Sequence, residues 1–227
     1  MDKKLFLCAT VTLTAGWLQA SELPSFNTSW ITGNPEVLTY HSTAKQGDGL
    51  YQVSVSRNDD NIEVYMNIIT PGFTKSVWGA MDTNLHPRES KSRIVVNNQI
   101  VMTTECSYAS NALHIATLMS PQKKLMENRI ANSDFVVDFS QAPLMARVLP
   151  LKLGAEFTFT SLNPRNNTLV PLKIRVVGQE TLQDIKCFKV ASAGFEGDAN
   201  YWVEQDGHHR VMRIEQAGSG RVNELIL

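Results

Sequence analysis

The sequence predicts an all-β protein: a strongly curved antiparallel sheet, or half-barrel, of about a dozen strands with one short helix at its mouth. Segments of alternating apolar and polar residues, rich in β-branched and aromatic side chains, follow one another from residue 36 onward. Most connections between them are too short for a crossover helix, and short connections force antiparallel pairing. Only residues 141–149 have the apolar spacing of a helix.

The predicted strands begin with a meander. Its turns are the clusters "QGDG" and "NDDN", whose residue types favour tight turns. Asn97–Asn98 marks the turn of a further hairpin within 92–104, whereas "KKLMENRI" is compatible with a strand or a helix. The strands expected in chain order are 37–44, 49–57, 61–69, 73–82, the two halves of 92–104, 133–140, 155–162, 169–178, 185–194, 200–205, 210–216 and 221–227.

The predicted helix lies in "SQAPLMARVLPLKLG". Ser140 is a suitable N-cap, and Pro143 falls in the first turn, where proline is tolerated. Pro150 ends the run. One helical face carries the apolar side chains Leu144, Met145, Val148 and Leu149. So short a helix needs a surface on which to bury this stripe, and the concave side of a curved sheet offers one.

The N-terminus has the order of a secretory signal peptide: two lysines, the apolar run "LFLCATVTLTAGW", and "LQA" before a polar "SE". Thirteen apolar residues fall short of the about 20 that a membrane-spanning helix needs. We therefore expect residues 1–20 to be removed between Ala20 and Ser21, releasing a periplasmic protein that does not span the membrane. Residues 21–35 then form an extended segment before a single domain, 36–227.

Composition argues against some functions. The whole chain has 21 Lys and Arg against 22 Asp and Glu, and its basic residues are not clustered. The electrostatic footprint of a nucleic-acid-binding protein is therefore lacking. We also find no Gly-x-Ser-x-Gly elbow, no phosphate-binding glycine loop and no Cys-x-x-Cys pair, and so expect no enzymatic activity and no cofactor.

Cys106 and Cys187 remain after removal of the signal peptide. An even number of cysteines in an exported protein favours a disulfide, and the alternative is two buried free thiols. Both alternatives stay open, because a sequence does not place the two Cα atoms within bonding reach. A nucleophilic role for Cys106 would need a nearby histidine such as His114.

The stretch "YWVEQDGHHRVMRIEQ" contains the adjacent residues His208 and His209. Asp206–Gly207 is a strong hairpin signal, and consecutive strand residues point to opposite faces of a sheet. The two imidazoles could not then bind one metal ion, and a longer turn would leave them exposed. No His-x-His or His-Glu-x-x-His spacing occurs elsewhere, so we expect a hairpin and no metal site.

Three segments resemble an exported bacterial family known as domain of unknown function 3108. They are "MARVLPLKLG", the "YWVEQDGHHRVMRIEQ" hairpin and the closing "RVNELIL". They are similar to that family's Arg-x-Leu-Pro-Leu…Gly segment, Tyr-Trp-Val strand and final Glu-Leu strand. The resemblance covers roughly residues 36–227 and implies a bent antiparallel sheet around a helix, similar to the half-barrel of the Lol lipoprotein carriers. It implies no catalytic residues.

A half-barrel with an apolar interior has the usual geometry of a small-molecule site. The leading hypothesis is thus a periplasmic protein that binds or carries a lipophilic molecule. The second hypothesis is an envelope assembly protein that docks on a partner through strand edges or through residues 21–36. The third is an unrecognised hydrolase. The candidate ligand-binding residues are Leu144, Met145, Arg147, Val148, Tyr201 and Trp202. Arg147 could lie along apolar surface or pair with an anionic headgroup.

Overall fold

The computed structural model describes residues 23–45, 47–131, 135–163, 166–194, 197–206 and 209–227. Within these ranges the chain forms one 15-stranded sheet, which curves strongly but does not close into a barrel. The predicted signal peptide and its cleavage site, Ala20 and Ser21, lie outside the described residues, as does His208.

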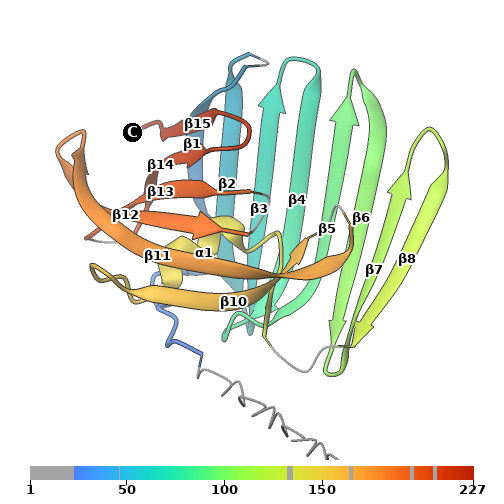
Figure 1. Cartoon of the computed structure of the whole chain (residues 1–227), viewed down its shortest axis with the longest axis horizontal. Helices are drawn as coiled ribbons and strands as arrows, with labels where there is room; N and C mark the ends of the chain where they lie inside the picture. Colours follow the sequence, from blue (N-terminus) through green and yellow to red (C-terminus); the bar gives the residue numbers. More distant parts are fainter. Residues whose placement is uncertain (1–22, 46, 132–134, 164–165, 195–196, 207–208) are drawn as a thin grey trace, which may run out of the picture.

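The first eight strands form one wall of the half-barrel, drawn from blue to yellow-green in Figure 1. They run up and down in chain order, each paired with the next in antiparallel register. Their bounds are β1 Glu36–Thr43, β2 Gly49–Asn58, β3 Asn61–Thr70, β4 Phe73–Asp82, β5 Pro87–Val96, β6 Gln99–Ala109, β7 Ala112–Met119 and β8 Lys124–Ala131.

The remaining strands form the second wall, which crosses in front of the first in Figure 1. The walls are continuous because β15 pairs with β1, while β8 and β9 are the two ends of the strand order. Among the strands of the described ranges, only β9 and β10 pair in parallel. The bounds are β9 Val136–Val137, β10 Glu156–Asn163, β11 Thr168–Leu182, β12 Ile185–Ala193, β13 Ala199–Glu204, β14 Val211–Gln216 and β15 Arg221–Leu225.

The predicted fold class is confirmed, with differences in detail. "KKLMENRI" belongs to strand β8, β7 was not predicted, and the strand expected over 133–140 is reduced to the two residues of β9. Here the chain leaves the sheet to form a turn whose side chains bond to their own backbone, which competes with strand pairing. The turn predicted at Asn97–Asn98 is confirmed, and both residues adopt positive φ.

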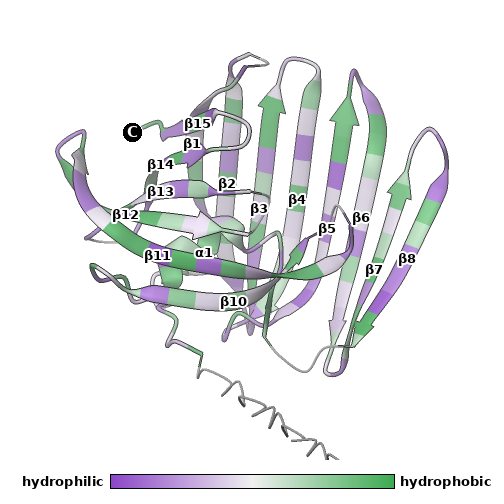
Figure 2. Ribbon diagram, in the orientation of Figure 1, coloured by the Kyte–Doolittle hydropathy of each residue, from purple (hydrophilic) through white to green (hydrophobic). Residues whose placement is uncertain are grey.

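Helix α1, Ala142–Val148, lies between the two walls (Figures 1 and 2), and all but its first residue are buried. The predicted N-cap, Ser140, is wrong: Gln141 occupies that position and makes no side-chain capping bond. Ser140 instead lies directly on β4, where a Cβ atom on Gly79 would come within 2.0 Å of its Oγ. Glycine at position 79 therefore allows the chain entering α1 to rest on the sheet.

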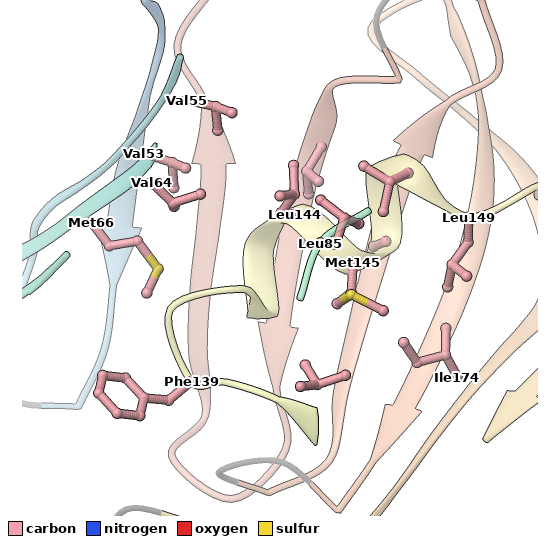
Figure 3. Close-up of a cluster of buried hydrophobic side chains, with 14 of the residues drawn as sticks. Val53, Val55, Val64, Met66, Leu85, Phe139, Leu144, Met145, Leu149 and Ile174 are labelled. Carbon is pink, nitrogen blue, oxygen red and sulfur yellow. The ribbon is translucent and has the colours of Figure 1, made fainter. Parts of the chain in front are cut away.

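The main hydrophobic core surrounds α1. Figure 3 shows Leu144 and Met145 on the helix among apolar side chains of both walls, such as Val64 on β3 and Ile174 on β11. Leu144 and Val148 are fully buried, and Met145 is 1% exposed. The apolar stripe predicted for the helix thus forms part of the hydrophobic core of this structure.

Candidate functional site

A small apolar void lies in the interior of the half-barrel, beside α1. Its volume is about 10 Å³, and it is largely enclosed between the helix and strands β11, β12 and β13. A void of this size has room for about one water molecule. Its lining consists of Ala142, Met145, Ala146, Leu172, Ile174, Val190, Ser192 and Tyr201.

The void exists because α1 presents alanines to this wall. Ala142 and Ala146 are four residues apart and therefore lie on the same face of the helix. Larger side chains at these positions would fill the space against Ile174 and Val190. Met145, also in the lining, is unbranched and can change its rotamer at low cost.

Tyr201 and Trp202, both candidate binding residues, lie on opposite faces of β13. Tyr201 is half-buried and lines the void. The Trp202 ring packs between the cationic ends of its cross-strand neighbours: Lys189 Nζ lies 4.8 Å and Arg213 Cζ 5.4 Å from its centroid. Its indole N–H donates to Glu180 at 2.7 Å, and this bond lowers the pKa of the Glu180 carboxyl. Trp202 therefore does not share a pocket with Tyr201.

Arg147 was a candidate to pair with an anionic headgroup, but in the structure its guanidinium contacts groups of the protein itself. Its side chain is 2% exposed, and its Nη1 lies 2.7 Å from Glu36 Oε2 on β1. Its Nε donates to the carbonyl oxygen of His209 at 3.1 Å, and its Cζ lies 3.8 Å above the ring of Trp30. The C-terminal end of α1 is thus tied to β1, to the β13–β14 connection and to the segment that precedes β1.

A second polar cluster ties the N-terminal end of α1 to the first wall. Asp138 is completely buried and accepts hydrogen bonds from Ser90 Oγ at 2.9 Å, from the Tyr108 hydroxyl and from the Ser140 N–H at 2.7 Å. Gln141 accepts from the Asp138 N–H at 2.7 Å and donates to the Leu85 carbonyl at 2.6 Å. Asp138 therefore makes the turn that sequence patterns suggest for Asp before a helix.

Burial decides the protonation behaviour of this cluster. Loss of water raises the pKa of Asp138, and the hydrogen bonds from Ser140, Tyr108 and Ser90 oppose that rise only in part. Burial, reinforced by the charge of Asp138, also raises the pKa of the Tyr108 hydroxyl and of the Cys106 thiol. Sequence reasoning missed the partners of Asp138, because they come from strands 30 and 48 residues away.

The two cysteines are free thiols on different walls, Cys106 on β6 and Cys187 on β12. The structure therefore has the second alternative, two buried free thiols, and no disulfide between these residues. Burial raises the pKa of the Cys187 thiol to about 11. His114 pairs with Ser107, so it faces away from Cys106 on the opposite side of the sheet. This geometry does not provide a Cys–His pair.

The histidine stretch forms a longer connection than a two-residue turn. β13 ends at Glu204 and β14 begins at Val211, and the Glu204 N–H donates to the Arg210 carbonyl at 2.9 Å. His209 has φ 51° and lies outside both strands. Burial and the nearby Arg147 charge lower the pKa of its imidazole. Within the described ranges, no three side chains of His, Cys, Asp or Glu gather closely enough to bind a metal ion.

The fold and interior together define a class: an open β half-barrel with a helix buried between its walls. The sequence profile of the family DUF3108, "Protein of unknown function", matches residues 37–223, and the chain belongs to this family. No protein with a curated description matches. A solved structure, a "Beta-barrel-like Protein of Domain of Unknown Function DUF1849 from Brucella abortus", is similar in fold. The TM-score is 0.54 at 8% identity, over 86% of this chain and 97% of the other.

Proposed function

We propose that the protein is exported to the periplasm and there binds a lipophilic molecule between α1 and the wall formed by β11, β12 and β13. The observation that carries the proposal is the void beside the helix. At this place the packing between α1 and the sheet is incomplete, and most of the lining is aliphatic. Export rests on the signal-like order of residues 1–20.

The size of the void sets a condition on binding. An alkyl chain is larger than a space of about 10 Å³, so it enters only when the Met145 side chain changes rotamer or α1 shifts. The bonds of Asp138 and Arg147 at the two ends of the helix oppose a shift. We therefore expect slow uptake of one small alkyl group or acyl end, and the proposal includes no catalytic step.

The test fills the void. Ala146→Phe places a ring larger than the void against Ile174 and Val190, and such overpacking costs about 1–3 kcal/mol or more. Circular dichroism and urea unfolding establish that the variant is folded before binding is measured. We expect wild type to bind a fluorescent fatty acid and Ala146→Phe to lose binding at least tenfold. Ala191→Phe is the matched control, because residue 191 follows Val190 on β12 and faces away from the void.

Native mass spectrometry of protein purified from the periplasm identifies the bound molecule. Two results would contradict the proposal: wild type that carries and takes up no lipophilic probe, or a folded Ala146→Phe variant that binds as wild type does.

The alternative is an envelope assembly protein without a small-molecule ligand. The N-terminal segment is a poor docking arm, because it packs on its own domain: the Asn27 N–H donates to the Val148 carbonyl at 2.7 Å and Ile31 is 3% exposed. The observation that favours this alternative is instead the strand β8, at one end of the sheet.

A further inference from the structure

Strand β8 is an open edge of the sheet. It is the last strand in the order, and within the described part of the chain its backbone hydrogen-bonds only to β7. Four of its eight residues are polar or charged, yet Leu125 is 57% exposed, and its cross-strand neighbour Leu118 is 43% exposed. The strand contains no proline, a residue that commonly protects such edges from pairing.

We propose that β8 pairs with β8 of a second copy of this chain, in antiparallel register about a two-fold axis through Asn128. Such pairing adds a strand to an edge through backbone hydrogen bonds, and side chains then set the register. A homodimer with this axis has an isologous interface, in which the same residues meet from both copies.

The face alternation of a strand limits the possible registers. Directly opposed residues must lie on the same face of the joined sheet, so the axis passes through a residue and not between two residues. An axis through Glu127 would oppose two glutamates, and an axis through Arg129 would oppose two arginines. Like charges directly opposite each other destabilise a sheet.

The register about Asn128 is complementary from Leu125 to Ala131. Glu127 opposes Arg129 of the second copy twice, once on each side of the axis. Met126 opposes Ile130 on one face, and Leu125 opposes Ala131 on the other. Glu127 and Arg129 form no ion pair within the described residues, and both lie on the outer face beside Lys91 and Glu105. Opposite charges and apolar pairs in these positions stabilise strand pairing.

The charge pair provides a sharp test. In the mature protein, Glu127→Arg places two arginines opposite each other, and Arg129→Glu places two glutamates opposite each other. We expect each single variant to raise the dimer dissociation constant at least tenfold in sedimentation velocity. The double variant Glu127→Arg/Arg129→Glu restores the opposed charges and should recover the wild-type constant. Lys91→Glu, on the same face but on β5, should leave it unchanged.

Crosslinking tests the position of the axis. The Cβ atoms of directly opposed residues lie about 4.5–5.5 Å apart, within disulfide reach. Asn128→Cys should therefore form a crosslinked dimer under mild oxidation. Leu125→Cys should not, since the two copies of that residue would be about 20 Å apart at the usual strand rise.

Wild type that is monomeric at its highest soluble concentration would overturn the proposal. So would single charge variants that dimerise normally, a double variant that stays as weak as the single ones, or crosslinking through residue 125 but not 128.

Discussion

The buried guanidinium of Arg147 on α1 forms an ion pair with the partly exposed carboxylate of Glu36 on β1, with 2.7 Å between Nη1 and Oε2. The pair joins the end of the helix to the first strand across more than a hundred residues of sequence. The Trp30 ring covers the guanidinium and the His209 carbonyl accepts from it, so the charge is enclosed on several sides. The helix is therefore held at this end by polar contacts as well as by its apolar stripe.

Removing one partner of this pair should be costly. Glu36→Leu leaves Arg147 buried without its carboxylate, which should lower the free energy of unfolding by about 3 kcal/mol. Glu36→Leu/Arg147→Met replaces both charges with apolar groups and should cost less than the sum of the two single changes. Urea unfolding of the four proteins gives the coupling energy. If the two single changes in unfolding free energy add up to that of the double variant, the interaction between Glu36 and Arg147 does not stabilise the fold.

The raised pKa of Asp138 predicts an unusual pH dependence of the free energy of unfolding. This pKa is raised in the folded state, so the folded protein binds the proton more tightly than the unfolded chain does. This contribution to stability is complete below the unfolded pKa of about 3.9 and is lost as pH rises through the higher folded pKa. Asp138→Asn stays neutral and should not show that loss. The measurement is the difference in unfolding free energy between the two proteins over acidic to neutral pH; a constant difference would contradict the prediction.

A substitution at Leu144 tests whether helix α1 is a permanent part of the core or a movable lid. Leu144 is fully buried, so Leu144→Asp should lower the unfolding free energy by roughly 4 kcal/mol or more, or prevent folding. Leu153→Asp is the matched control, because Leu153 is 64% exposed and the change there should stay within about 0.5 kcal/mol. A Leu144→Asp variant that remains stable but loses uptake of a lipid probe would identify α1 as a lid.

The histidine pair should have no role in metal chemistry. We expect His208→Ala/His209→Ala to change the unfolding free energy by no more than about 1 kcal/mol, because the Arg147 contact uses the His209 backbone. Elemental analysis of wild type and of the variant should find the same metal content. Stoichiometric zinc that disappears with the double substitution would refute this.

The signal peptide should be cleaved after Ala20. N-terminal sequencing of the protein from a periplasmic fraction should begin at Ser21, in accordance with the "LQA" that ends the apolar run. A chain that stays in the cytoplasm and begins at Met1 would contradict export. No helix within the described residues has the length and hydropathy to cross a bilayer.

Local pattern was sufficient for most strands of the sheet, although it missed β7 and left the type of β8 open. The strand predicted over 73–82 coincides with β4, and the turns after β2 and β5 lie where Asp, Asn and their neighbours place them. Alternation, turn chemistry and the two prolines around α1 are properties of neighbouring residues, so they can be recognised without the fold. The antiparallel class, the single helix and its apolar stripe follow from the sequence for the same reason.

The partners of the polar residues were decided only by tertiary structure. The sequence singled out Arg147, but not its partners Glu36 and Trp30 or the buried Asp138–Tyr108 pair, which join distant segments. Nor could it tell that Trp202 faces away from the void or that the two thiols lie on different walls. A buried charge takes its partner from whichever strand the curvature of the sheet brings within about 3 Å, and that curvature depends on the pairing of all fifteen strands.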